Sequence, residues 1–221
     1  MNVFVITSIL NPKIGIIDPE TRYQQTLKTI QSIKDRAPGS MIMVVDSSPQ
    51  LEQHKIDSIR KEVDYFVSLS NHQMSNDLAN SGLKSQGECY IMLVAIDAIR
   101  NMAREDIKRV FKITGRAELT DRFNIGDYNN PEMKGMYVFK TPVVSWMSQH
   151  LKLVDTRLWS FDYSLLDQAE QLVRYAYEET MTTRFDLEHA YYKLLPKDKI
   201  LEKDVIGLKC ILASDGTEIN E

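Results

Sequence analysis

Apolar runs typical of strands alternate with amphipathic helical segments along the first seventy residues, and this alternation constrains the fold more than any other feature. The pattern predicts strands at residues 3–6, 41–45 and 65–69, separated by helices at 22–36 and 51–62. Strands joined through helices pair in parallel with right-handed crossovers. With a further strand at 110–113, the chain is expected to be an α/β protein with a Rossmann-like, three-layer α/β/α arrangement and a mostly parallel central sheet.

The rest of the chain is less regular. We expect helices at 88–104, 143–153, 165–181 and 184–195, strands at 136–140 and 207–213, a tight turn at 214–217, and a loop at 122–134. Residues 75–84 are ambiguous, and a loop near the ligand is the interpretation that we give them. The helix at 88–104 is apolar nearly all round, which predicts burial. No internal repeat, low-complexity stretch or clear linker separates these elements, so one domain with two lobes is expected.

Composition excludes several classes of protein. The net charge of −4 argues against nonspecific binding of nucleic acid. The two cysteines, Cys89 and Cys210, stand in apolar runs and are expected to be reduced core residues of a cytoplasmic protein. The longest apolar run, 89–96, is far shorter than the roughly 20 residues of a membrane span, and no signal peptide is expected before the first strand.

Three predicted strands end in polar clusters: Thr7 with Ser8, Asp46 with Ser47 and Ser48, and Thr114 with Gly115 and Arg116. In open α/β sheets the ligand crevice lies beyond the carboxyl ends of the strands, so these clusters should line one crevice. Glycine allows a sharp turn or a close backbone approach, and Arg116 and Glu118 would point to one side of an extended segment. The alternatives are a solvated turn after residue 113 and, for Asp46, turn initiation before Pro49.

A second cluster combines Asp186, Glu188 and His189. Asp186 and His189 are three residues apart and share a helix face, directed away from the predicted buried stripe, where a carboxylate and an imidazole could act as a general base or a metal pair. Thr183 and Asp186 also match a capping box, so Asp186 could simply begin the helix. For His189 the alternative is a buried polar partner.

The order of the motifs resembles that of GT-A-type glycosyltransferases of the polysaccharide-biosynthesis or viral type. The matching segments are 4–8, 22–27, 45–48, 112–116, 156–159, 186–189 and 206–216. The resemblance implies a single GT-A-like domain over 1–221, with a nucleotide-binding half at 1–120 and an acceptor-side half at 121–221. It implies an enzyme of the hexosyltransferase class that moves a sugar from a nucleotide-sugar donor to a glycan or other hydroxyl acceptor.

The same resemblance assigns roles to residues. The donor would contact Thr7, Ser8, Arg22, Asp46, Ser47, Gly115, Arg116 and Arg157. Asp186 or Glu188 would deprotonate the acceptor if the reaction inverts, with His189 as an alternate base or metal ligand.

The chain departs from the family at its metal motif. Such enzymes often hold Mn²⁺ or Mg²⁺ on an Asp-x-Asp, but here the equivalent place reads Gly115-Arg116-Ala117-Glu118, with Ala117 in place of a tyrosine. Either Glu118 is a lone carboxylate ligand, or Arg116 neutralises the diphosphate without metal, or the site is degenerate. A catalytically weak GT-A-like nucleotide-binding or partner subunit is one alternative. A nucleotidyltransferase is another alternative, although this chain lacks the glycine-rich loop that such enzymes usually carry after the first strand.

Overall fold

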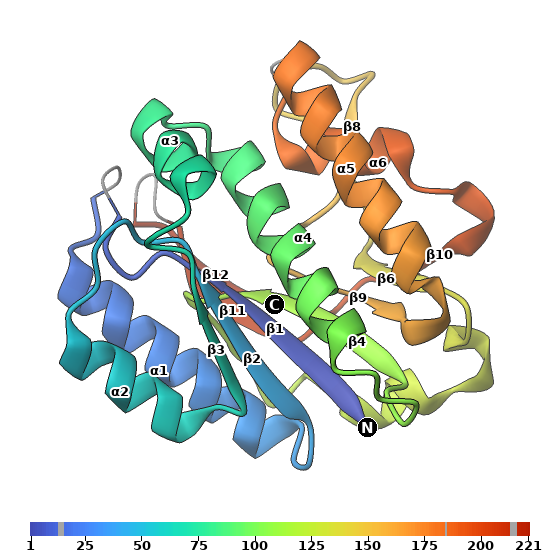
Figure 1. Cartoon of the computed structure of the whole chain (residues 1–221). Helices are drawn as coiled ribbons and strands as arrows, with labels where there is room; N and C mark the ends of the chain where they lie inside the picture. Colours follow the sequence, from blue (N-terminus) through green and yellow to red (C-terminus); the bar gives the residue numbers. More distant parts are fainter. Residues whose placement is uncertain (13–15, 184, 213–215) are drawn as a thin grey trace.

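A twisted sheet of seven strands runs through the centre of the computed structural model, which describes residues 1–12, 16–183, 185–212 and 216–221 (Figure 1). The strand order is β10-β6-β9-β4-β1-β2-β3. The strands are β1 (Asn2–Ser8), β2 (Met41–Asp46), β3 (Tyr65–Ser68), β4 (Arg109–Thr114), β6 (Tyr137–Lys140), β9 (Leu158–Asp162) and β10 (Ile200–Lys203). Both halves of the chain therefore contribute to one sheet.

Parallel pairing dominates this sheet. The neighbours β3, β2, β1 and β4 run parallel, and β10 is parallel to β6. Only β9 runs against its neighbours, β4 and β6. Thr7 of β1 is in register with both Val45 and Thr114, so three strands end side by side. The predicted α/β fold with a mostly parallel sheet is confirmed.

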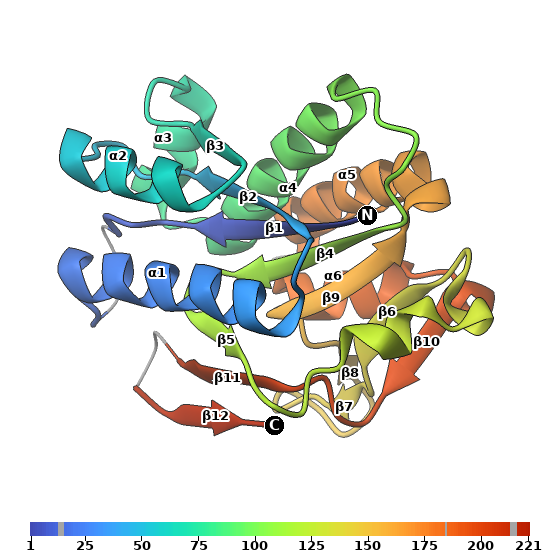
Figure 2. The ribbon, with the colours of Figure 1, turned by 90° about the horizontal axis from the view of Figure 1, so that it is seen from below.

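Helices cover both faces of the sheet, as a three-layer arrangement requires (Figures 1 and 2). The helices α1 (Pro19–Arg36) and α2 (Gln53–Glu62) pack on one face, and α4 (Lys84–Asn101), α5 (Leu166–Thr183) and α6 (Leu187–Leu194) pack on the other. Each face of the sheet has its own hydrophobic core, because successive side chains of a strand point to opposite faces. Val110 of β4 belongs to the core on the α4 side, whereas Phe111 and Ile113 belong to the core on the α1 side.

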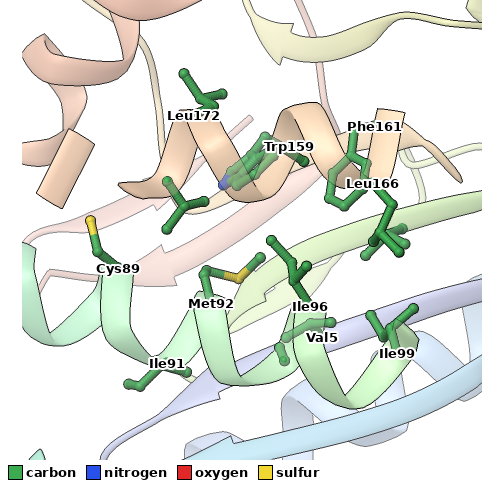
Figure 3. Packing of buried hydrophobic residues seen from close by; sticks show 14 of the residues in the cluster. Val5, Cys89, Ile91, Met92, Ile96, Ile99, Trp159, Phe161, Leu166 and Leu172 are labelled. Atoms are coloured by element: carbon green, nitrogen blue, oxygen red, sulfur yellow. The ribbon is translucent and has the colours of Figure 1, made fainter. Parts of the chain in front are cut away.

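The larger core lies between α4, α5 and the sheet (Figure 3). Met92 and Ile96 of α4 belong to this core together with Trp159 of β9 and Leu172 of α5, and all four side chains are buried. This packing fixes α4, whose first turn lies near the carboxyl edge of the parallel strands. Burial of the helix at this position confirms the sequence prediction.

Smaller elements complete the fold. An antiparallel sheet contains β5 (Ala117–Leu119), β11 (Leu208–Ile211) and β12 (Glu218–Asn220), and a separate hairpin pairs β7 (Val143–Val144) with β8 (Lys152–Leu153). Four 3-10 helices are described: Ile125–Asn129, Pro131–Met133, Tyr163–Leu165 and Lys197–Lys199.

Within the described ranges, no helix has the length and apolar character needed to cross a membrane.

Two local predictions are wrong. Residues 143–153 form the β7–β8 hairpin instead of a helix, because Val143 pairs with Leu153 across the strands although residues 143, 147 and 151 recur at helical spacing. Residues 75–84 are not a loop, since α3 (Gln73–Ser81) occupies most of them and ends at Gly82 with a φ of 72°. Of the turn expected at 214–217, positions 214 and 215 lie outside the described residues.

Candidate functional site

A cleft of about 400 Å³ opens at the carboxyl edge of β1, β2 and β4. The strand ends contribute polar residues to it: Thr7, Ser8, Ser47, Thr114, Gly115 and Arg116. Helix α1 adds Arg22 and Thr26, α3 adds Ser75 and Leu78, α4 adds Glu88, and the start of α6 adds Asp186, Leu187 and Glu188. The topology therefore brings most of the predicted site residues together.

Two arginines give one wall of the cleft its positive charge. Arg22 is 8% exposed, and its guanidinium donates a hydrogen bond of 3.3 Å to Oε1 of Gln25. Arg116 has a buried Nε without a hydrogen-bond partner among the described residues. Burial, and secondly the charge of Arg116, lower the pKa of Arg22 to about 10. Neither guanidinium forms an ion pair with a described carboxylate, which is unusual for a buried arginine such as Arg22 and a half-buried one such as Arg116.

Gly115 sets the position of Arg116. Its N–H donates to the carbonyl of Thr7 over 2.9 Å, and its carbonyl accepts from Oγ1 of Thr26, also over 2.9 Å. A Cβ atom here would lie 3.1 Å from that hydroxyl oxygen and 3.3 Å from the Thr7 carbonyl. The close backbone approach predicted from the glycine is present, and it turns the chain into the cleft at Arg116.

Asp46 lies beneath the cleft and is fully buried. Its two carboxylate oxygens accept hydrogen bonds of 2.9 Å from the backbone N–H groups of Leu10 and Ser48. Burial raises the pKa of Asp46 although these hydrogen bonds oppose the shift. The carboxylate thus fixes the loops that follow β1 and β2, and it is not among the cleft-lining residues.

Three carboxylates line the cleft from the other face of the sheet: Glu88, Asp186 and Glu188. Oε1 of Glu188 accepts a hydrogen bond of 2.7 Å from the hydroxyl of Thr156. Burial, followed by repulsion from Glu88, raises the pKa of Glu188. A carboxylate whose pKa is raised toward pH 7 is a stronger base, and is therefore better suited to accept a proton from a hydroxyl group.

Asp186 is the N-cap of α6, where its Oδ1 accepts a hydrogen bond of 3.1 Å from the backbone N–H of His189. Asp186 therefore caps the helix, as one alternative predicted, but not in a capping box with Thr183, which is the last residue of α5. The same oxygen contacts Nδ1 of His189, and Nε2 of that ring lies 2.7 Å from Oγ of Ser145. The side chains of Asp186 and His189 are in contact, as their spacing predicted, but the imidazole of His189 is only 4% exposed instead of directed away from the buried residues. The alternative of a buried polar partner is therefore the one found for His189.

Two other predicted residues lie outside the cleft. Arg157 donates from Nε to Oδ1 of Asp155 over 2.9 Å and pairs with Glu221 at 3.2 Å. Glu118 of β5 pairs with Lys209 at 3.0 Å. Glu221 and Lys209 lie far from these residues in the sequence, so local sequence could not reveal them, whereas Asp155 is only two positions from Arg157.

The described residues hold no group of three or more histidine, cysteine, aspartate and glutamate side chains that could bind a metal ion. Glu118 is held by a lysine, and both ring nitrogens of His189 have protein partners. These residues do not fit a protein-held divalent ion, so a requirement for Mn²⁺ or Mg²⁺ stays a prediction.

Sequence reasoning missed the buried ion pair behind the cleft. Lys112 of β4 is 1% exposed, and its ammonium donates to Oε1 of Glu88 and, over 2.5 Å, to the carbonyl of Thr156. Thr156 also bonds Glu188, so the pair connects α4, β4 and the first turn of α6. A lysine in an otherwise apolar strand was the available signal, because a buried lysine needs a partner.

Known proteins resemble this chain in structure and not in sequence. No family model matches the sequence, and no curated protein matches it. A glycosyltransferase involved in the glycosylation of the major capsid of PBCV-1 has 9% identity and a TM-score of 0.49, over 92% of this chain and 82% of that chain. The glycosyltransferase GlyE of Streptococcus pneumoniae TIGR4 has 12% identity and a TM-score of 0.51, over 92% of this chain and 44% of that chain. This chain thus spans less than half of GlyE, and the likeness to GlyE shows that it folds like a glycosyltransferase.

Proposed function

We propose that the cleft binds a nucleotide-diphosphate sugar and transfers the sugar to a hydroxyl acceptor. The observation that carries this proposal is the position of Arg22 and Arg116 at the carboxyl edge of the parallel strands, without carboxylate partners among the described residues and facing the cleft. Likeness of fold alone does not establish an activity, so the argument depends on the chemistry of this site.

A diphosphate accounts for the two arginines. Guanidinium groups bind phosphate oxygens through paired hydrogen bonds, and a diphosphate supplies enough negative charge for both. Bound anion would also relieve the repulsion between Arg116 and the buried Arg22. Thr7, Ser8 and Ser47 line the same edge and offer hydroxyl groups to the rest of the nucleotide.

The carboxylates supply the second part of the reaction. Glu188 would accept the proton of the acceptor hydroxyl, while that oxygen bonds to the anomeric carbon and the bond from this carbon to the diphosphate oxygen breaks. Negative charge that develops on the leaving diphosphate is then stabilised by Arg22 and Arg116. Asp186 serves α6 as a cap, which leaves Glu188 as the better base. The base role of Glu188 applies to a reaction that inverts the anomeric configuration. The hexosyltransferase class, a glycan acceptor in polysaccharide biosynthesis and a cytoplasmic location remain predictions.

A second candidate is a nucleotide-binding partner subunit with little or no transferase activity. The observation that favours it is the lack of a three-ligand metal group among the described residues, where such folds often carry an Asp-x-Asp. Binding of a nucleotide sugar without any sugar transfer, both with and without Mn²⁺, would favour this candidate over the transferase.

Calorimetric titration tests the proposal. A panel of nucleotide-diphosphate sugars, each with and without Mn²⁺, should include at least one that binds the wild type, and Arg116→Ala should weaken this binding. Arg122→Ala is the matched control, because Arg122 is an exposed arginine outside the cleft. Absence of binding across the panel, or equal weakening by both substitutions, would refute the proposed donor site.

A further inference from the structure

The β7–β8 hairpin exposes a concentrated apolar surface. Val143, Val144, Trp146 and Met147 are 50%, 57%, 82% and 47% exposed. Among the eleven exposed large apolar residues of the described chain, these four fall within five consecutive positions. Single exposed apolar side chains are ordinary, but a contiguous group marks an interaction surface.

The hairpin is uncovered on both sides. Consecutive residues of a strand point to opposite faces, yet Val143 and Val144 of β7 are each exposed by half or more. A flat protein surface or a flat sugar ring would cover only one of these faces. A lipid interface surrounds an inserted tip on all sides, and tryptophan is enriched at such interfaces.

The charge near the tip favours an anionic partner. No aspartate or glutamate occurs from position 133 to position 154, although the whole chain has a net charge of −4. His150 and Lys152 of the hairpin are exposed. Lysine beside an apolar tip is attracted to the negative surface potential of anionic lipids.

The base of the hairpin is fixed to the rim of the cleft. Ser145 donates its N–H to the carbonyl of Leu151 over 2.8 Å, and its Oγ lies 2.7 Å from Nε2 of His189. His189 contacts Asp186, which lines the cleft, and the N–H of Val154 donates to the carbonyl of Glu188 over 3.3 Å. A surface that meets the tip would therefore lie beside the cleft.

From these observations we infer that the β7–β8 hairpin docks on an anionic lipid bilayer through Val143, Val144, Trp146 and Met147, with Lys152 at the headgroups. This binding site goes beyond the proposed glycosyl transfer and does not depend on it. Docking would hold the cleft next to the lipid surface.

Tryptophan fluorescence gives a direct test, because the chain has two tryptophans and Trp159 is only 2% exposed. Vesicles of phosphatidylcholine with phosphatidylglycerol should shift the emission of Trp146 to the blue and carry the protein into the pellet. Phosphatidylcholine vesicles alone, or high salt, should reduce both effects. No shift and no pelleting with the anionic vesicles would overturn the inference.

Two variants separate docking from other causes. Val144→Ser with Met147→Ser should weaken vesicle binding by about tenfold or more, since it removes apolar contact while keeping Trp146 as reporter. Lys152→Glu should weaken binding to anionic vesicles as well, and Tyr175→Ser, at an exposed residue of α5, is the matched control. Wild-type binding by both hairpin variants, or a blue shift that appears with protein concentration in the absence of vesicles, would contradict a lipid partner.

Discussion

Arg22 of α1 and Arg116 of the turn after β4 lie in one cleft, although they are 94 positions apart and carry like charges. Burial and, secondly, the charge of Arg116 lower the pKa of Arg22 to about 10, which is the mark of a buried cation beside another cation. Such an arrangement is costly for the empty protein, and an anionic ligand offsets the cost.

Removal of either guanidinium should therefore weaken the binding of nucleoside diphosphates. Arg116→Ala is expected to cost about 1.5–3 kcal/mol of binding free energy, the scale of a charged hydrogen bond, and Arg22→Ala a similar amount. Isothermal calorimetry measures both, with circular dichroism to verify folding. Unchanged affinity in a folded Arg116 variant would exclude this residue from the donor site.

The two carboxylates at the start of α6 should respond differently when each is replaced by an uncharged residue. Glu188→Gln keeps an oxygen for the Thr156 hydroxyl but cannot accept a proton, so turnover should fall about 100-fold or more. Asp186→Ala removes a helix cap and should cost about 1 kcal/mol of unfolding free energy with most of the turnover retained. Transfer assays and thermal melts on both proteins distinguish these roles; full activity in the Glu188 variant would remove it as the base.

The raised pKa of Glu188 predicts a pH dependence. The base is active only when ionised, so the rate should rise with pH through a value above the ordinary glutamate pKa of about 4.3. Because the folded-state pKa is raised, the stabilisation from the neutral carboxyl is present below the unfolded pKa and is lost as pH rises through the folded one. Glu188→Gln should gain stability relative to wild type over that window. A pH-independent stability difference would contradict the shift.

The ion pair behind the cleft should be asymmetric under mutation. Glu88→Gln leaves the ammonium of Lys112, which is 1% exposed, without its carboxylate, and should cost about 3–5 kcal/mol of unfolding free energy. Lys112→Met leaves Glu88, which is 30% exposed and accessible to water, so the loss should be smaller. Urea unfolding of the two variants compares them, and a larger loss in the Lys112 variant would refute this explanation.

Sequence patterns predicted five of the seven central strands, most clearly those that are apolar on both faces, but missed β9 and β10. β1, β2 and β4 are buried along nearly their whole length, so continuous apolar runs located them, and the alternation with helices predicted their parallel pairing. The same pattern failed at 143–153. There the exposed apolar residues recur at helical spacing, yet cross-strand pairing decides the structure.

The site was predictable where strand ends determine it. Thr7, Ser47 and Arg116 reach the cleft because they lie at or just beyond the ends of strands that run side by side. Arg157 carries the same charge as Arg116 but is held by Asp155 and Glu221, the latter 64 positions away. Partners that distant depend on tertiary packing, which also explains why Lys112 and Glu88 were missed.

Release of nucleoside diphosphate from nucleotide sugars, measured with a hydroxyl acceptor present, tests the central claim most directly. At least one donor should be turned over by the wild-type protein. Glu188→Gln should reduce the rate by about 100-fold or more, and Arg116→Ala should reduce it by about 10-fold or more. Binding of a donor without any turnover, or turnover that survives both substitutions unchanged, would contradict the account of this cleft as a glycosyl-transfer site.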